Sequence, residues 1–411
     1  MRPLWAVILI ASALAPGLSA RGEEPLTLEK AVEIALARNP KVLEARAGVE
    51  ASRGRTLQLR SRPEPGVVAS LEGIPIPGLK KDGDGTEVSL GIEQVFEYPG
   101  KRSLRAEIGR QGEDLAQSEL DRVRLLLASQ VKKNYWRAAF STGAVAALER
   151  SASRLDALLE NVQAKYQTGS ATFADVLRVR AEKARLRNQI LDQSKERRMA
   201  ELNLNELLAR PPSEPIELLT SLPFNPLAVD PAALLETARV SLPSFRVAAL
   251  RMERAGSAIK LADLGRRPDF LAGLLLPSVR PNAWGVSFGL TMPFLRPGRA
   301  KGAAMEAHAE AESSRLASEA LDRRVETAIK SAFAAAKSAE EQVRVYERSL
   351  LTELEEELGI QLEYFRYGKV EAYSLLDLYR TYVLAQVEHL RALLLYNLAL
   401  ADLEVAGEET E

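Results

Sequence analysis

The chain of 411 residues contains no cysteine, only two histidines and few aromatic side chains, which make up 6% of the sequence. Without cysteine there is no disulfide, no thiolate nucleophile and no thiol to acylate at the amino terminus. His308 and His389 have no neighbours at metal-ligand spacing, and no phosphate-binding loop, nucleophile elbow or zinc-binding helix motif is present. The sequence therefore predicts neither an enzyme nor a protein that carries a metal ion or another cofactor.

An excess of charge of one sign is also missing, because 55 Lys and Arg residues balance 56 Asp and Glu residues. This balance excludes the strong basic field with which many proteins attract nucleic acid, so we expect no nucleic-acid partner. From residue 21 onward no stretch of 18 consecutive apolar residues occurs. Insertion of the mature chain into a membrane would therefore require β-strands.

The first 20 residues have the pattern of a secretory signal peptide. Arg2 provides positive charge, residues 4–14 form an apolar stretch too short to span a bilayer, and Leu18-Ser19-Ala20 offers a cleavage site. We therefore expect residues 1–20 to be removed on export. The alternative is that this segment stays in place as an uncleaved anchor.

The rest of the sequence contains two copies of one plan. Residues 88–92, 96–101 and 166–169 are echoed in the same order by residues 286–290, 294–299 and 365–368. A proline-rich stretch separates the copies, and proline favours an extended connector over a helix. We therefore divide the mature chain into repeat 1 (residues 21–209), a linker (210–228), repeat 2 (229–407) and an acidic tail (408–411).

Each repeat predicts a helix, two short strands, a very long helix and a returning helix. Residues 100–165 contain no proline and would form a helix about 100 Å long, with residues 302–365 as its counterpart. Apolar residues recur at alternating steps of three and four in both helices, which is the heptad spacing of a coiled coil. They are Leu148, Ala152, Leu155, Leu159 and Val162 in the first helix and Leu351, Leu354, Leu358 and Phe365 in the second, where Gln361 fills the remaining position of the series. The predicted class is mainly α, with two antiparallel coiled hairpins that turn near Gly169 and Gly368.

The predicted strands alternate apolar residues with polar or small ones, as a sheet between lipid and water requires. The residues expected to face lipid are Val88, Leu90, Trp284, Val286, Phe288 and Leu290, with Trp284 as an anchor at the headgroups. The alternative is the edge of a soluble β-sandwich packed on the helices. Four strands leave two open edges, and closing a barrel takes about eight strands, so at least two chains must join. The strands alone leave two, three or four subunits possible.

Three stretches resemble the TolC-type outer-membrane efflux protein family, the outer-membrane factors of tripartite efflux systems. They are residues 26–40, the strand-to-helix corner at residues 96–101 and the turn at residues 169–177. The resemblance implies a homotrimer in the outer membrane of a Gram-negative bacterium. Each subunit would give four strands to a 12-stranded transmembrane β-barrel and its helices to a periplasmic coiled-coil α-barrel.

The same resemblance implies partners and an activity. The partners would be a periplasmic adaptor (membrane fusion) protein, an inner-membrane pump of the RND type and the lipid of the outer membrane. The channel would export small molecules or metal ions, and the corner Tyr98-Pro99-Gly100-Lys101 resembles metal-efflux members. One alternative is the exit duct of a type I protein-secretion system. An alternative from another class is a soluble periplasmic coiled-coil scaffold or adaptor.

The resemblance also implies a periplasmic gate, to which Asp175, Asp377 and Phe365 correspond by position. The sequence departs from the family pattern at Val370 and Ser374, where family members carry an arginine and a second acid. The closed-state ion pairs must then be rebuilt with other cations, for which Arg366 and Lys369 are candidates. A ring of acids at a constriction would favour cations. The alternative is that both aspartates face solvent or cap the following helix.

The turns themselves are the expected contacts with the adaptor. Gly169 with Ser170 and Gly368 with Lys369 form these turns, and glycine permits a tight reversal and the close approach of another helical hairpin. The alternative is a purely structural turn, since glycine commonly ends helices.

Overall fold

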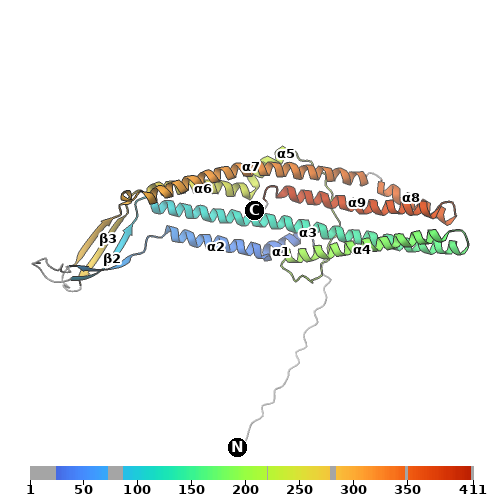
Figure 1. Cartoon of the computed structure of the whole chain (residues 1–411), viewed down its shortest axis with the longest axis horizontal. Helices are drawn as coiled ribbons and strands as arrows, with labels where there is room; N and C mark the ends of the chain where they lie inside the picture. Colours follow the sequence, from blue (N-terminus) through green and yellow to red (C-terminus); the bar gives the residue numbers. More distant parts are fainter. Residues whose placement is uncertain (1–24, 73–86, 220, 278–283, 348–349, 409–411) are drawn as a thin grey trace, which may run out of the picture.

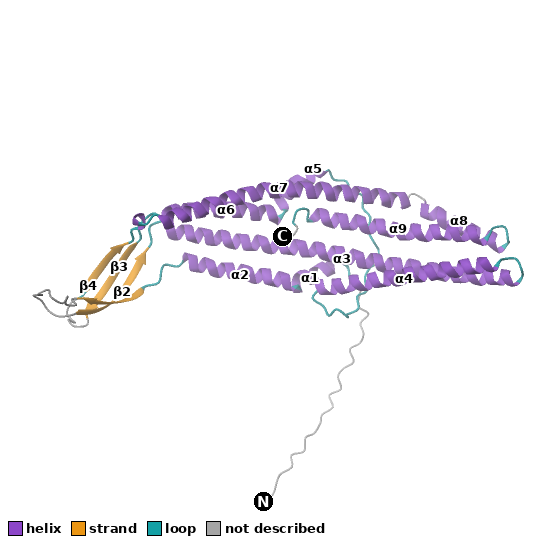
Figure 2. Ribbon diagram, viewed as in Figure 1, coloured by secondary structure: helices purple, strands orange, loops and turns teal. Residues whose placement is uncertain are grey.

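The computed structural model describes residues 25–72, 87–219, 221–277, 284–347 and 350–408. The molecule is elongated, with a small sheet at one end and two helical hairpins at the other (Figures 1 and 2). The expected signal peptide and the loop predicted between the first two strands lie outside the described residues. The sheet and the hairpin ends are thus separated by the length of the long helices.

The first repeat forms four helices and two strands. They are α1 (Leu28–Arg38), α2 (Pro40–Arg60), β1 (Gly66–Glu72), β2 (Glu87–Phe96), α3 (Lys101–Gln167) and α4 (Phe173–Leu207). Thr27 caps α1 by accepting a hydrogen bond from the backbone N–H of Lys30, and Asn39 caps α2 through the N–H of Lys41. The predicted long helix is confirmed as α3, with 67 residues.

The second repeat follows the same course, which confirms the predicted duplication. Its elements are α5 (Pro231–Ser241), α6 (Pro243–Leu264), β3 (Phe270–Pro277), β4 (Gly285–Leu290), a short 3₁₀ helix η1 (Pro293–Leu295), α7 (Gly298–Glu347), α8 (Leu350–Arg366) and α9 (Ala372–Glu404). The single helix expected over residues 302–365 is described as two, α7 and α8. None of the described helices combines the length and apolar composition needed to cross a bilayer.

The four strands form one antiparallel sheet in the order β1-β2-β3-β4. The register places the alternating apolar residues of the strands on one face of the sheet. For example, Leu90 of β2 pairs with Ala69 of β1 on one side and with Leu276 of β3 on the other. The large apolar residues of this face are exposed: Val67, Leu71, Val88, Leu90, Ile92, Phe96, Phe270, Leu274, Leu276, Val286, Phe288 and Leu290. Burial against helices, as in the soluble alternative, is therefore not seen in this chain.

One of the expected lipid-facing residues, Trp284, lies just outside β4. Trp284 directly precedes the strand and is 71% exposed, while Met292 follows it and precedes the 3₁₀ helix that begins at Pro293. Proline lacks a backbone N–H and cannot extend a ladder, so the pairing ends before it. The strand is consequently shorter than the alternation of residues predicts.

The sheet and the helices beside it form an open row. In the described part of the chain β1 and β4 each pair on one side only. The neighbouring helices repeat this order, since α2 packs on α3, α3 on α6, and α6 on α7. One end of this row therefore consists of β1 and α2, and the other end consists of β4 and α7.

The corner between β2 and α3 joins the two repeats. The backbone N–H of Tyr98 donates to Asp269 Oδ1 over 2.7 Å, and Lys101 Nζ lies 2.8 Å from the same oxygen. Gly100 between them has φ of +97°, a left-handed conformation that favours glycine. The corner residues that resemble metal-efflux members thus have a structural task, which is to fix the start of α3 against the start of β3.

The linker and the C-terminal end pack on the helices. Leu26 and Leu218 form a parallel bridge beside α1, and Asn225 accepts a hydrogen bond at its carbonyl from the Tyr396 hydroxyl. Glu408, which the sequence assigns to an acidic tail, is buried. Its carboxylate accepts from the N–H of Ser244 and lies 3.4 Å from Arg122 Nε. The described end of the chain therefore holds α6 against α3.

The exposed apolar face generates a prediction about assembly. Phe288 is 83% exposed in the single chain, and an arginine at the middle of a lipid-facing strand costs about 2–4 kcal/mol. We expect Phe288→Arg to reduce the amount of assembled protein in the membrane fraction, while Ser287→Arg, on the opposite face, assembles normally. Normal assembly of Phe288→Arg would show that this face does not meet lipid.

Candidate functional site

The end of the molecule opposite the sheet, called the tip below, consists of two hairpin turns (Figure 1). Gly169 and Gly368 have φ of +75° and +73°. The N–H of Gly169 donates to the Tyr166 carbonyl and that of Ser170 to the Lys165 carbonyl, which is a Schellman motif. The second turn repeats both bonds. Each glycine is therefore required by the turn itself, and the surrounding loops are exposed.

Asp175 starts the helix that follows the first turn. Its carboxylate accepts from the backbone N–H and the hydroxyl of Thr172, whose own Oγ1 accepts from the N–H of Asp175, forming a capping box. Arg178 Nη1 lies 3.1 Å from the carboxylate. The Thr172 hydrogen bonds, aided by Arg178, lower the pKa of Asp175. The aspartate is thus ionised and engaged in capping α4.

Phe365 lies inside the tip. It is buried in the apolar cluster that joins the two hairpins, among residues such as Val162 and Leu358. Lys165 Nζ donates to the Phe365 carbonyl over 2.6 Å and lies 4.7 Å from the centre of its ring. The ammonium group therefore sits at the C-terminal end of α8, where helix carbonyls favour a positive charge. In this way α3 is tied to the end of α8.

Further from the turns, charged side chains cross between the hairpins. Arg380 Nε of α9 donates to Glu182 Oε2 of α4 over 2.6 Å, and the Glu182 side chain is only 4% exposed. Arg154 of α3 lies 3.1 Å from Glu355 of α8 and also reaches the hydroxyl of Tyr382. Both links join repeat 1 to repeat 2. We call the Glu182–Arg380 and Arg154–Glu355 pairs, with the Lys165–Phe365 bond, the cross-hairpin links.

A tyrosine reinforces this region. The Tyr379 hydroxyl donates to the Ser151 carbonyl, and burial raises the pKa of Tyr379 to about 12. The phenol therefore stays protonated at every physiological pH and keeps donating. Burial likewise raises the pKa of Tyr382, against the opposing effect of Arg154. These two tyrosine contacts are consequently insensitive to moderate changes of pH.

The two cations expected to rebuild the missing ion pairs do not cross between hairpins in this chain. Arg366 pairs with Glu363 on its own helix at 2.7 Å, and Lys369 lies 5.8 Å from the centre of the Tyr364 ring. Their role in closed-state ion pairs stays a prediction, because a single chain shows only their contacts along their own hairpin. Lys165, Arg154 and Arg380 supply the crossing cations instead.

Asp377 differs from Asp175. It is exposed on α9, and within the described residues its carboxylate makes neither an ion pair nor a hydrogen bond. The structure brings Asp175 and Phe365 into contacts that hold the tip together, whereas the Asp377 carboxylate is left to solvent. Ser170 and Lys369 are exposed on the turns. Their assignment as gate or adaptor contacts stays a prediction.

The crossing pairs were missed from the sequence, although one of them leaves a signal. Glu182 lies between Val179 and Leu186, three residues after one and four before the other, so it occupies a seam position of the coiled hairpin. A charge at a seam position needs a buried partner. Arg380 lies three residues before Val383 at the corresponding place in α9. Its partnership with Glu182 depends on a separation of 198 residues, which no local pattern encodes.

Comparison with solved structures shows the same fold in outer-membrane channels. The superposition on VceC from Vibrio cholerae covers 93% of this chain and 97% of VceC, with 16% identity and a TM-score of 0.75. For MtrE of Neisseria gonorrhoeae, solved in its open state, coverage is 93% and 88%, identity 20% and TM-score 0.74. For CusC, coverage is 92% and 91%, identity 19% and TM-score 0.75. Comparison with curated protein sequences gives no match.

Residues 31–210, most of the first repeat, match the model of the outer membrane efflux protein family. This part of the chain is similar to that family. Its members are non-enzymatic transport channels and the outer-membrane component of tripartite efflux systems. The match supports a location in the outer membrane with extension into the periplasm. Among the described residues of the chain no group of three or more His, Cys, Asp or Glu side chains is arranged to hold a metal ion.

The Glu182–Arg380 pair generates a prediction about stability. Arg380→Gln would leave the buried Glu182 carboxylate with only Arg185, at 3.6 Å, and an unpaired buried group costs about 1–3 kcal/mol. We expect this variant to lower the midpoint of guanidinium unfolding, measured by helical circular dichroism. The double variant Glu182→Gln, Arg380→Gln should recover much of the loss. Arg366→Gln, which breaks an exposed pair, is the control and should change little. Equal effects of Arg366→Gln and Arg380→Gln would contradict the assignment.

Proposed function

We propose that this protein is a homotrimeric exit duct for small molecules or metal ions. Three copies of the four-stranded sheet supply twelve strands, and three copies of the α2-α3-α6-α7 row supply the helical wall that continues them. The proposal includes export directed by residues 1–20 and the division into repeats 21–209 and 229–407 joined by the linker 210–228. Energy for transport comes from a pump, because the chain carries no nucleotide-binding motif.

One observation carries the proposal: an exposed apolar sheet face bounded by two unpaired edges. Backbone groups without partners cost several kcal/mol each in hydrocarbon, so a sheet that enters lipid must close. Edge β4 of one copy can pair with edge β1 of the next, and α7 then meets α2. This head-to-tail contact closes into a ring after a fixed number of copies. The resemblance to the outer membrane efflux protein family supports three.

At the other end, we propose that the exposed turns contact a periplasmic adaptor protein. An inner-membrane pump of the RND type would supply the substrate. Gly169 and Gly368 leave the turns without side chains, so another helical hairpin can approach closely, while Ser170 and Lys369 offer polar contacts. The cross-hairpin links hold the two hairpins of each subunit together. Opening of the duct at the tip then requires that these links break or move as a unit.

The proposed duct is tested by assembly and conductance of the purified full-length protein. We expect extraction from membranes to require detergent, chemical cross-linking to stop at three subunits, and the detergent-purified protein to form discrete conductance steps in planar bilayers. A water-soluble monomer that leaves membranes on carbonate washing would contradict the duct and favour a coiled-coil scaffold.

Asp377 generates a second prediction for the duct. Its exposed carboxylate, repeated in three subunits, would place three negative charges around one constriction and favour cations. Asp377→Asn should lower the cation-to-anion permeability ratio in planar bilayers by about two- to fivefold. Asp175→Asn, at the other acidic gate candidate, should lower the ratio less, since Arg178 lies 3.1 Å from the Asp175 carboxylate and offsets its charge. An unchanged ratio in Asp377→Asn would remove this residue from the pore.

A further inference from the structure

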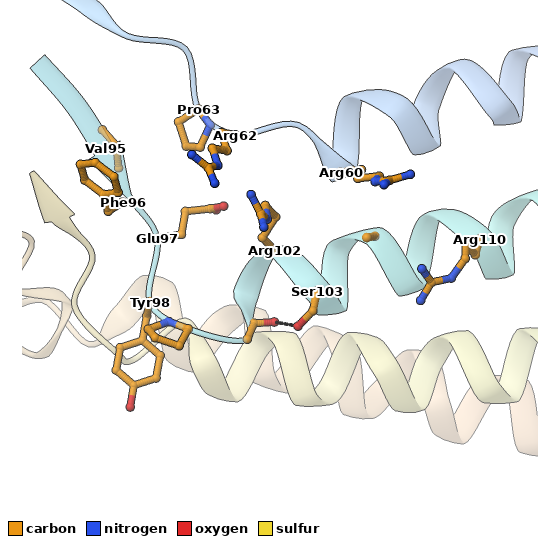
Figure 3. A pocket seen from close by; sticks show the side chains of 13 residues that line it. Arg60, Arg62, Pro63, Val95, Phe96, Glu97, Tyr98, Arg102, Ser103 and Arg110 are labelled. Carbon is orange, nitrogen blue, oxygen red and sulfur yellow. Dashed lines mark hydrogen bonds between the residues drawn. The ribbon is translucent and has the colours of Figure 1, made fainter. Parts of the chain in front are cut away.

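A basic cleft of about 670 Å³ lies where the sheet meets the helices, between the end of α2 and the start of α3. We call it the junction cleft. Figure 3 shows the side chains of Arg62 and Arg102 close to Glu97, while Arg60 lies further along, at the end of α2. Its other lining residues are Pro63, Val95, Phe96, Tyr98, Pro99, Gly100, Ser103, Ala106 and Arg110. The cleft is therefore lined by guanidinium groups on one side and by apolar side chains on the other.

The positive charge of the junction cleft is not neutralised within the chain. Arg60, Arg62 and Arg102 are exposed and make no ion pair or hydrogen bond to any described residue. The one carboxylate that lines the cleft, Glu97, is already paired with Arg105 at 2.5 Å. Arg110 pairs with a glutamate of its own helix. Three arginines without an ion-pair partner among the described residues thus line one cleft, and Arg62 and Arg102 face each other across Glu97 (Figure 3).

The crevice between α4 and α9 shows that an excess of arginine over acidic side chains is not a general feature of the grooves of this protein. It has Arg185, Arg380 and Arg391 among its lining residues, and Glu182, Asp192 and Glu388 match them in number. Arginines in the junction cleft have no such matching acids. Guanidinium groups bind phosphate through paired, parallel hydrogen bonds, which makes a phosphate group the ligand that three of them fit best.

The apolar side of the cleft continues onto the sheet. Phe96 lines the cleft, is 48% exposed, and lies on the same face as Ile92 and Leu90 by strand alternation. Both of those residues are also more than half exposed. A ligand whose phosphate occupies the cleft would therefore find an apolar surface leading away from it along β2. This combination matches a lipid rather than a free inorganic anion.

The position of the cleft agrees with this chemistry. Its lining residues come from the end of α2, the end of β2 and the start of α3, where the sheet meets the helices. If the sheet spans the membrane, as the proposed function requires, the cleft lies at the inner, phospholipid leaflet. We propose that the junction cleft binds the phosphate of an anionic phospholipid, whose acyl chains lie along the apolar face at Phe96 and Ile92. The bound lipid fixes the depth at which the sheet sits in the membrane.

Native mass spectrometry of the full-length protein in a non-ionic detergent tests the site, with phosphatidylglycerol, phosphatidylcholine and inorganic phosphate as probes. We expect preferential retention of phosphatidylglycerol by the wild-type protein. Arg62→Gln, Arg102→Gln should weaken it by about thirtyfold, since each basic side chain near an anionic surface contributes a factor of about five. The control Arg55→Gln, Arg150→Gln removes the same charge from exposed positions outside the cleft and should bind as the wild type does.

Three results would overturn the proposal. Equal retention of phosphatidylglycerol by both double variants would show nonspecific attraction. Displacement of the lipid by millimolar inorganic phosphate would show a site for a free anion. Loss of the wild-type oligomer in Arg62→Gln, Arg102→Gln would assign these arginines to a contact between copies. Should the double variant fail to fold, judged by circular dichroism, Arg60→Gln replaces it and must weaken binding by about fivefold.

The same preparation separates this proposal from the proposed function. Planar-bilayer conductance of the wild-type protein reports the duct and does not depend on the identity of the lipid in the cleft. Conductance without arginine-dependent lipid retention would overturn the lipid site alone. Retention that depends on Arg62 and Arg102 in a protein that forms no pore would support the lipid site and contradict the duct.

Discussion

The pairing of backbone hydrogen bonds in the sheet is the constraint on which the rest of this structure depends. Three strand pairs satisfy the interior of the sheet, and β1 and β4 each leave one row of N–H and C=O groups. Water can solvate such rows, but hydrocarbon cannot. Because the helices α2 and α7 end the same row, an identical subunit that completes the strands also completes the helical wall. One closure thus serves both layers.

The corner residues carry this constraint from sheet to helices. Asp269, at the start of β3, accepts from the Tyr98 N–H and pairs with Lys101 at the first turn of α3. A 67-residue helix would amplify a small rotation at its base into a large displacement at its tip. Fixing that base through a group of the other repeat makes the two repeats one rigid unit near the membrane. Motion of the tip must therefore arise further along the helices.

Local periodicity predicted most of the fold, and tertiary register decided the rest. Alternation over residues 88–92 and heptad spacing over residues 148–162 are local properties, so the strands and the coiled hairpins followed from them. The role of Asp175 was ambiguous, because the same local sequence is compatible with an acid that caps the helix and with an acid that faces the pore. The Glu182–Arg380 pair could not be predicted, since it depends on how two helices from different repeats align.

The two ends of the molecule treat charge in opposite ways. At the tip, cationic side chains of one repeat pair with acids or carbonyls of the other, and each pair stabilises the packing of the two repeats within the chain. At the base of the sheet, Arg60, Arg62 and Arg102 share one cleft without an acid left to pair with them. Mutual repulsion of these groups is tolerable only where water or an anion screens it. The cohesion of the tip is thus internal to each subunit, whereas the base is electrostatically completed from outside the chain, by the membrane that surrounds it.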